Sequence, residues 1–473
     1  MKITFLYVNP NRYTGIPVGL SYLISILKNE GHELSLFDTT FYDFNYTDFN
    51  LSGNLPQAGK EIINGFKLLV KKKNPDLVGV SCTSVCLNFA IKMLESLENR
   101  PITIFGGVGA TVDYTELIKK EVVDYVCVGF GEKTLPIFVK NLENKKSVEG
   151  IQNLVYKKEK QVKINEFSQI VDLSKIPIPD WSLFDKRHFK RIFKGRIKRW
   201  GSFQLVRGCP FNCAYCVNNY YHKTLGIKIN RLPIEKSIEE IKVLSQKYRL
   251  DIIRLCDECF GFGNPEYYRK FARAYKREVG PPTIVATRPE AITPETIEIL
   301  KDLKCISVSI GIEAGDEAQR KWMLDRRVSN EIIKRAFDLL YKAGIRTSSY
   351  NIIGFPEDTR KKIFETIKLN RECKPGHINV FIFSPLPKTK LRDYCLKNGL
   401  LDTTSAVDFI KKSIVKNKNL TKQELYGLFR TFEYYIKLPE YVYPLIKRAE
   451  KGDKIGNIIF NLLKKVAILR YGY

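Results

Sequence analysis

"RGCPFNCAYC" at residues 207–216 sets Cys209, Cys213 and Cys216 in a C-x3-C-x2-C spacing. Thiols this close can converge from one loop onto one metal centre, and cysteine thiolates are the usual protein ligands of iron–sulfur clusters. A structural zinc site normally takes four protein ligands, and no fourth Cys or His is close in the sequence. The spacing therefore favours a four-iron four-sulfur cluster with one iron open to a substrate, with zinc as the weaker alternative.

The chain on either side of the motif alternates β-rich runs with helical patterns. From residue 198 the runs include "DIIRLCDECF", "PTIVATR", "CISVSIGIE", "RTSSYNIIGF" and "NVFIFSPL". Successive βα units of this kind predict a partial or full (β/α) TIM-like barrel over residues 198–388, with functional groups at the carboxyl ends of its strands. Residues 389–473 are helical and lysine-rich and are expected to form a C-terminal helical domain.

The first 148 residues contain a second set of alternating runs. "KITFLYV", "ELSLFD", "LVGVSC", "ITIFGG" and "YVCVG" read as strands, with helical patterns between most of them. We therefore expect an α/β, Rossmann-like (flavodoxin-like) domain over residues 1–148, with a ligand at the carboxyl ends of its strands. Residues 149–197 are interpreted as a linker that contains a small hairpin.

Composition narrows the class of protein. Eleven cysteines, an odd number in a long chain without a secretion signal, favour free thiols or metal ligands over disulfides and predict a reducing, cytoplasmic location. No apolar run is long enough to span a bilayer. The formal charge is +27, and it is densest in "KRHFKRIFKGRIKR" at residues 186–199. No nucleic-acid-binding fold signature accompanies that cluster, so we expect no nucleic-acid partner.

The cysteine motif resembles that of the radical S-adenosylmethionine (radical SAM) enzymes, because the aromatic Tyr215 precedes the third cysteine. The resemblance implies that the three cysteines ligate the cluster, that SAM chelates its open iron, and that one electron splits SAM to a 5'-deoxyadenosyl radical. It also implies that Tyr215 lies where the adenine edge of SAM is contacted.

Other SAM contacts follow from the same resemblance. Asp257 in "LCDECF" is expected to bind the methionine ammonium, with Glu258 beside it, and the alternative is a solvated strand end. Glu313 in "SIGIEAG" would accept hydrogen bonds from the ribose, while Ala314 replaces the usual serine. Gly354 in "YNIIGFPEDT" would allow close approach of the adenine.

Several further residues match the subgroup pattern or depart from it. Arg288 and Arg327 match arginines of the subgroup and could bind a carboxylate or lie at the surface. Lys388 replaces a glycine of the relatives' Pro-Gly-Thr turn. Cys256 and Cys259 could bind a second metal only if the strand turns between them. The other cysteines are interpreted as small buried hydrophobes, namely Cys82, Cys86, Cys127, Cys305, Cys373 and Cys395.

Four loops of the first domain resemble those of cobalamin-binding domains: "GIPVGLSYLISILKNEGHELSLFD", "GVSCTS", "FGGVGATVDYTELI" and "VDYVCVGFGEKTL". Glycines just after strands would let a flat corrin approach the backbone. Ser81, Thr83 and Thr134 could donate hydrogen bonds to its arms, and Glu132 is placed to cap the next helix. The expected cobalamin contacts are Pro17, Gly19, Leu20, Ser81, Thr83, Gly106, Gly107, Gly131, Glu132 and Thr134.

Histidine is absent from the expected cobalt site. Some corrin domains supply a histidine through Asp-x-His-x-x-Gly, and none of His32, His188, His222 and His377 stands in that motif. The resemblance therefore implies cobalamin bound base-off without a histidine ligand, and His32 is expected to be structural.

The resemblance implies a methyltransferase that acts on an unactivated carbon, or a phosphinate phosphorus, of a small molecule or peptide. An anionic substrate and an electron donor such as flavodoxin or ferredoxin would suit it. A cyclase or ring-rearranging enzyme with the same cofactors is the main alternative. An RNA-binding iron–sulfur protein and a methylthiotransferase are weaker ones. We expect the helical tail to pack on the barrel, although a basic amphipathic helix there could touch a membrane surface.

Overall fold

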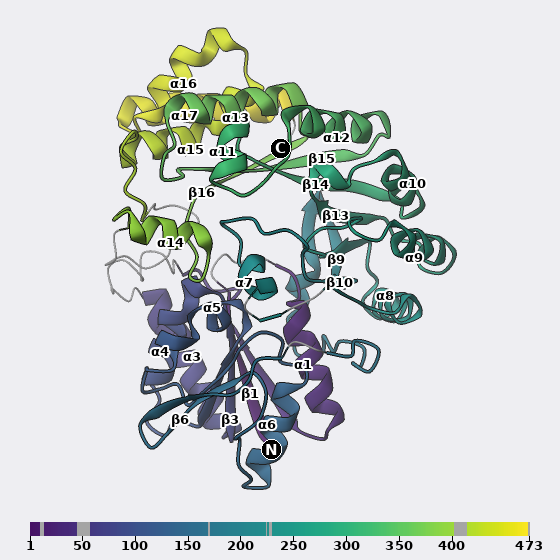
Figure 1. The fold of residues 1–473 in the computed structure, drawn as a ribbon, viewed down its shortest axis with the longest axis vertical. Helices are drawn as coiled ribbons and strands as arrows, with labels where there is room; N and C mark the ends of the chain where they lie inside the picture. Colours follow the sequence, from purple (N-terminus) through teal and green to yellow (C-terminus); the bar gives the residue numbers. More distant parts are fainter. Residues whose placement is uncertain are drawn as a thin grey trace.

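The computed structural model describes the whole chain except residues 10–13, 45–56, 169–170, 224, 227–228, 402–413 and 472–473. The chain forms two seven-stranded sheets, one in each half of the molecule. Figure 1 shows the amino-terminal sheet in the lower half, the second sheet above it, and the last helices at the top.

The first sheet has the strand order β2-β1-β3-β4-β5-β6-β7, and β1 to β5 are parallel. The order 2-1-3-4-5 is that of flavodoxin-like domains, as predicted. Its strands are β1 (Lys2–Val8), β2 (Glu33–Asp38), β3 (Leu77–Cys82), β4 (Ile102–Gly106), β5 (Tyr125–Cys127), β6 (Leu154–Lys158) and β7 (Gln161–Ile164). Its helices are α1 (Val18–Asn29), α3 (Gln57–Lys73), η1 (Ser84–Cys86), α4 (Leu87–Glu95), α5 (Gly107–Leu117) and α6 (Thr134–Glu143).

Both parts of the expected linker join a sheet. The predicted hairpin forms as β6 and β7, and β6 pairs antiparallel with β5, so the hairpin extends the first sheet. Further along, β8 (Lys190–Phe193) pairs antiparallel with β9 (Arg196–Phe203) and becomes the edge of the second sheet. The segment between them is also packed, since Trp181 is buried against Phe189 and Phe203.

The second sheet has the order β16-β15-β14-β13-β12-β9-β8. The six strands from β9 to β16 are parallel, so the structure resolves the prediction in favour of a partial barrel. The further strands are β12 (Ile252–Leu255), β13 (Thr283–Thr287), β14 (Cys305–Glu313), β15 (Arg346–Ile353) and β16 (His377–Ile382). Its helices are α8 (Ile234–Tyr248), α9 (Pro265–Glu278), η3 (Pro289–Ala291), α10 (Pro294–Asp302), α11 (Glu317–Trp322), α12 (Asn330–Lys342) and α13 (Arg360–Cys373).

The tail is helical, as expected. Its elements are α14 (Lys390–Lys397), α15 (Lys422–Lys437), η4 (Glu440–Val442), α16 (Tyr443–Glu450) and α17 (Lys454–Tyr471). Leu425 and Phe432 of α15 share a buried cluster with Ile353 of β15 and Ile363 of α13. This apolar contact fixes the tail on the barrel. Within the described residues, the structure contains no helix with the length and apolarity needed to cross a bilayer.

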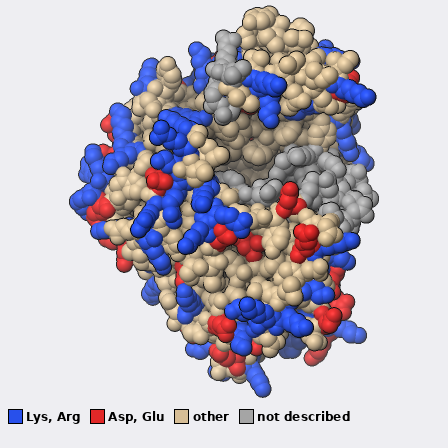
Figure 2. Space-filling model, turned by 180° about the vertical axis from the view of Figure 1, so that it is seen from behind, with Lys and Arg blue, Asp and Glu red and all other residues tan. Residues whose placement is uncertain are grey.

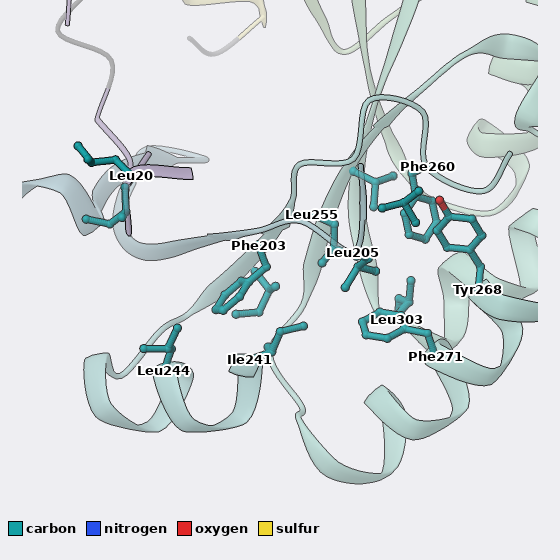
Figure 3. Packing of buried hydrophobic residues seen from close by; sticks show 14 of the residues in the cluster. Leu20, Phe203, Leu205, Ile241, Leu244, Leu255, Phe260, Tyr268, Phe271 and Leu303 are labelled. Atoms are coloured by element: carbon teal, nitrogen blue, oxygen red, sulfur yellow. The ribbon is translucent and has the colours of Figure 1, made fainter. Parts of the chain in front are cut away.

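The two halves share apolar packing at their boundary. Leu20 of α1 belongs to the same buried cluster as Phe203 and Leu205, which lie on and just after β9 (Figure 3). Conversely, Tyr220 of the short helix α7 (Asn218–Lys223) belongs to the buried cluster of the first domain. Since α7 begins two residues after Cys216, the cysteine loop is anchored to both halves of the molecule.

Candidate active site

The cysteine loop begins where β9 and the two-residue strand β10 (Val206–Arg207) end, at the carboxyl edge of the second sheet. The loop is held from two sides, because the N–H of Ala214 donates to the carbonyl of Leu324 and its carbonyl accepts from the N–H of Leu391. These backbone bonds fix the middle of the motif, as a cluster ligand loop requires.

The three motif thiols differ in exposure. Cys213 is buried, whereas Cys209 and Cys216 are partly exposed. Burial raises the pKa of Cys209 to about 12 and that of Cys216 to about 11. In the part of the chain that the structure describes, no three His, Cys, Asp or Glu side chains converge tightly enough to hold a single metal ion. A four-iron cluster has a wider ligand set, since each thiolate binds a different iron, and three cysteines on one fixed loop fit it.

Asp257 lies under this loop. Its Oδ1 accepts hydrogen bonds from the backbone N–H groups of Leu205 at 2.7 Å and Val206 at 3.1 Å, and the hydroxyl of Tyr268 lies 3.3 Å from Oδ2. Burial raises its pKa to about 7. Both carboxyl oxygens therefore have protein donors. Asp257 thus positions the strand that leads into the cysteine loop.

Glu258, the neighbouring carboxylate, has an exposed side chain. Its Oε1 lies 3.1 Å from Nε2 of Gln204, at the end of β9. Desolvation by the surrounding protein raises its pKa. Of the two acids that the sequence places here, Glu258 is the one that can contact a ligand.

Arg288 contacts the cysteine loop directly. Its Nη1 lies 3.1 Å from Sγ of Cys213, its guanidinium carbon lies 3.6 Å from the centre of the Phe211 ring, and Glu290 pairs with it at 2.5 Å. The side chain is buried. The structure therefore rules out the surface alternative for Arg288 and places a cation beside the thiol of Cys213.

A second buried arginine lies at the end of β14. Arg326 Nη1 is 3.8 Å from Oε1 of Glu313, and Tyr215 hydrogen bonds to the same carboxylate. Glu313 has a φ of 67°, in the left-handed region that non-glycine residues rarely adopt. Arg327 is exposed, which agrees with the surface alternative for that residue, and its neighbour Arg326 is the arginine beside the carboxylate. Glu313 and Tyr215 are thus brought together, and their contacts with SAM stay predictions.

The glycine of the adenine segment has a second structural reason. Gly354 has a φ of 81°, and a Cβ atom there would lie 2.7 Å from Cδ2 of Leu425 in α15. Its backbone N–H donates to Asp358 at 2.7 Å. Glycine is therefore required by the packing of the tail, and its contact with adenine stays a prediction. Lys388 keeps the left-handed turn with a φ of 61° despite its side chain.

The remaining cysteines have separate surroundings. Cys259 is buried with its Sγ 3.6 Å from Oγ1 of Thr287, whereas Sγ of Cys256 lies 3.8 Å from the carbonyl of Arg254. The two thiols therefore have different partners. The six cysteines interpreted as hydrophobes are all buried, which confirms that prediction.

A cavity of about 300 Å³ opens at the carboxyl edge of the first sheet. At Gly19 and Gly106, an added Cβ atom would meet nothing within 4 Å, so side chains there would occupy the cavity itself. This glycine-lined cradle fits a flat macrocycle. Eight of the ten expected contacts line it, namely Pro17, Gly19, Leu20, Ser81, Gly106, Gly107, Gly131 and Glu132.

Two expected hydroxyls have protein partners and are not among the residues that line the cavity. Oγ1 of Thr134 donates to the carbonyl of Gln152 at 3.0 Å, and Oγ1 of Thr83 lies 3.7 Å from Sγ of Cys86. The capping expectation for Glu132 is wrong, because its carboxylate pairs with Arg207 at 2.7 Å. No side-chain hydrogen bond caps α6 at Lys133.

Tyr221 is a cavity residue from outside the first domain that the sequence did not predict. It lies on α7, five residues after Cys216, yet it lines the cavity of the first domain. Burial, with smaller contributions from the nearby Glu258 and Cys216, raises its pKa to about 12. Helix α7 therefore links the cysteine loop to the cavity of the first domain, and Figure 1 shows α7 between the two halves.

Histidine does not line the described wall of the cavity. His188 is buried in the linker, where Nε2 lies 2.5 Å from Oδ2 of Asp38 and Nδ1 accepts from the N–H of Gly15. His32 lies 3.1 Å from the amino group of Met1, as a structural residue. The axial ligand of cobalt stays a prediction from the sequence.

Comparison with protein families identifies two domains. Residues 203–369 match the model of the radical SAM superfamily, and residues 6–139 match that of the B12 binding domain. The first match covers β12 to β15 of the second sheet, and the second match covers β2 to β5 of the first sheet with most of the residues that line the cavity.

Two relatives extend over most of the chain. An uncharacterised methyltransferase of Pyrococcus horikoshii is 25% identical and aligns over 93% of each chain. The anaerobic magnesium-protoporphyrin IX monomethyl ester cyclase of Rubrivivax gelatinosus is also 25% identical, over 87% of this chain and 72% of its own.

Two solved structures share the fold. The radical SAM methyltransferase TsrM of Kitasatospora setae, with tryptophan and a SAM analogue bound, has a TM-score of 0.68 at 16% identity, covering 84% of this chain and 76% of its own. The cobalamin-dependent radical enzyme OxsB has a TM-score of 0.65 at 14% identity, covering 100% and 73%. These likenesses confirm the expected fold class. The two domain matches support the expected cofactors, which are a four-iron four-sulfur cluster, SAM and cobalamin. The chain thus joins a domain that matches the B12 binding domain to a domain that matches the radical SAM superfamily.

Proposed function

We propose that this enzyme transfers a methyl group from SAM to an unactivated carbon, or to a phosphinate phosphorus, of a small molecule or peptide. The observation that carries the proposal is the shared wall: Tyr221 lines the corrin cradle from a helix that starts two residues after Cys216. A substrate between the two sites would be reached both by the radical source and by the methyl carrier. Figure 2 shows the surface hollowed between the upper and lower halves.

The cofactors supply the chemistry when bound: the cluster donates the electron that cleaves SAM, and the corrin carries the methyl group. The chain holds and orients them. We assign the cluster to Cys209, Cys213 and Cys216, and the ribose of SAM to Glu313, whose carboxylate is fixed by Tyr215 and Arg326.

The ammonium of SAM is assigned to Glu258, because its carboxylate is exposed at the carboxyl end of β12 while Asp257 is occupied by backbone donors. Gly354 remains the proposed neighbour of the adenine. In the cradle, Ser81 is the hydroxyl that remains available to a corrin arm, since it lines the cavity.

The reaction needs partners outside the chain. The electrons must come from a low-potential donor, for which a flavodoxin or ferredoxin is the expected class. The net charge of +27 suits an anionic substrate or donor. The eleven cysteines are all free, which supports a reducing compartment such as the cytoplasm.

Cyclisation is the second candidate, favoured by the likeness to the Rubrivivax cyclase over most of this chain. Methyl transfer and cyclisation differ in the products that they form from SAM. Methyl transfer consumes one SAM to give S-adenosylhomocysteine and a second to give methionine and 5'-deoxyadenosine, whereas cyclisation requires only the second process.

The test uses the anaerobically reconstituted enzyme with cobalamin, a chemical reductant and SAM that carries a deuterated methyl group. We expect S-adenosylhomocysteine and 5'-deoxyadenosine together, with the labelled methyl recovered on cobalamin or on product. Formation of 5'-deoxyadenosine without S-adenosylhomocysteine would overturn methyl transfer and leave the cyclase.

A further inference from the structure

Helix α17 carries an exposed row of large apolar side chains. Ile455, Ile458, Leu462 and Val466 are between 48 and 60% exposed. Their spacing of three and four residues places them on one stripe of the helix, about 16 Å long at 1.5 Å per residue. We call these four residues the α17 stripe.

The stripe is separate from the face that packs on the protein. Leu463 and Ala467 are buried against the α15–α16 layer, on the side of the helix next to the stripe. The apolar surface of α17 is therefore wider than the face that packs against the rest of the protein. Tyr441 and Leu445 of the preceding η4–α16 segment are also exposed, by 81% and 53%.

Basic side chains accompany the stripe. On the helical wheel, Lys454 and Lys465 lie on the polar side next to the stripe, and Lys464 lies farther round the helix. The sequence of α17 contains no Asp or Glu. None of the three lysines forms an ion pair with any residue that the structure describes. Figure 2 shows a broad uncharged surface at the end of the molecule that carries these helices, with basic side chains beside it.

We propose that the α17 stripe docks this enzyme on the surface of an anionic membrane, with the helix lying in the plane of the interface. An apolar row of this kind would enter the boundary of the acyl chains while the lysines meet the lipid phosphates. No described helix could cross the bilayer, so the contact is peripheral.

Charge argues against the other obvious occupant, a second copy of the chain. In a two-fold contact the same patch meets itself. Two α17 stripes face to face would bring Lys454 and Lys465 of each copy close to those of the other, on chains that each carry +27. An anionic bilayer complements the same arrangement.

The experiment is cosedimentation of the reconstituted holoenzyme with phosphatidylcholine vesicles that do or do not contain phosphatidylglycerol. We expect binding only to the anionic vesicles, and weaker binding as salt rises. Ile458→Glu with Leu462→Glu should reduce binding at least about tenfold. Lys454→Gln with Lys465→Gln should reduce it about fivefold per lysine. Ile332→Glu, at a 42% exposed site on α12, is the matched control and should bind like the wild type.

The variants concern exposed side chains outside the active site, so cobalamin and iron contents should equal those of the wild type. Failure of the wild type to bind anionic vesicles at low salt would overturn the proposal. Binding by both double variants that equals that of the wild type would also overturn it. A wild-type dimer that dissociates to monomers in the Ile458→Glu variant would also overturn the proposal, because the stripe would then be an interface between copies. Should the double Glu variant not fold, the lysine variants decide.

Discussion

Arg207 and Glu132 form an ion pair that joins the two halves of the enzyme, with Nη2 and Oε1 2.7 Å apart and both side chains almost fully buried. Arg207 lies two residues before Cys209, and Glu132 lines the corrin cradle. The Arg207 guanidinium also faces the rings of Tyr22 and Phe130. The cysteine loop and the cobalamin loop are therefore held in one fixed relation.

Loss of one partner of this pair should cost roughly 3–5 kcal/mol of unfolding free energy, because the other charge is left buried and unpaired. We expect Glu132→Leu to lower stability and weaken cobalamin binding, as measured by denaturant unfolding and by titration of apoenzyme. Glu132→Leu combined with Arg207→Met should recover most of the stability. If the single variant unfolds like the wild type, the pair does not join the halves.

Gly106→Val should exclude cobalamin and leave the cluster in place. Gly106 has an extended backbone that valine can adopt, and its Cβ would point into open cavity space. We expect a graded loss, with Gly106→Ala weakening cobalamin binding less than Gly106→Val. Iron content serves as the control and should not change. Full cobalamin binding by the valine variant would place the corrin elsewhere.

Glu240 should make stability depend on pH. Burial raises its pKa from 4.5 to about 7, even though Tyr22 donates to it and Lys236 and Arg207 favour its charged form; the Glu239 charge opposes them. The folded protein thus binds this proton more tightly than the unfolded chain. The stability that the proton contributes is complete below pH 4.5 and is lost as pH rises through 7.

Glu240→Gln, which keeps a neutral acceptor for Tyr22, should therefore be more stable than the wild type at pH 8, by up to ~3 kcal/mol. The difference should shrink towards zero near pH 4.5. Thermal unfolding across this range measures it, with the exposed Glu239→Gln as control. A difference between Glu240→Gln and the wild type that does not vary with pH would contradict the assignment.

Glu313→Gln should weaken SAM binding by about tenfold, because hydrogen bonds to a charged acceptor are worth more than those to a neutral one. The measurement is the KM for SAM in 5'-deoxyadenosine formation. Glu317→Gln, at an exposed position beyond the strand end, is the control. An unchanged KM with a lower kcat would mean that Glu313 acts other than by holding SAM.

Much of this arrangement is readable from the sequence, because the decisive signals are local. "LVGVSC" is a continuous apolar run and forms the buried parallel strand β3. The spacing of Cys209, Cys213 and Cys216 and the glycines after β4 likewise need only their neighbours to be recognised.

The features that the sequence could not supply depend on how the halves pack. Glu132 reads as a helix cap because its partner, Arg207, is 75 residues away. The sequence alone does not show which of the adjacent Arg326 and Arg327 turns its side chain toward Glu313. Tyr221 reads as part of a helix after the cysteine motif, and only the docking of α7 on the first domain brings it to the corrin cradle.

The central claim is that one chain holds a SAM-cleaving cluster beside a cobalamin. The direct test is anaerobic reconstitution of the wild type and of Cys213→Ala, followed by assays of iron, cobalamin and 5'-deoxyadenosine on each preparation. We predict about four irons and about one cobalamin per wild-type chain, with SAM cleavage. Cys213→Ala should keep the cobalamin and lose SAM cleavage. Cleavage retained by Cys213→Ala, or a wild type that binds no cobalamin, would contradict the account.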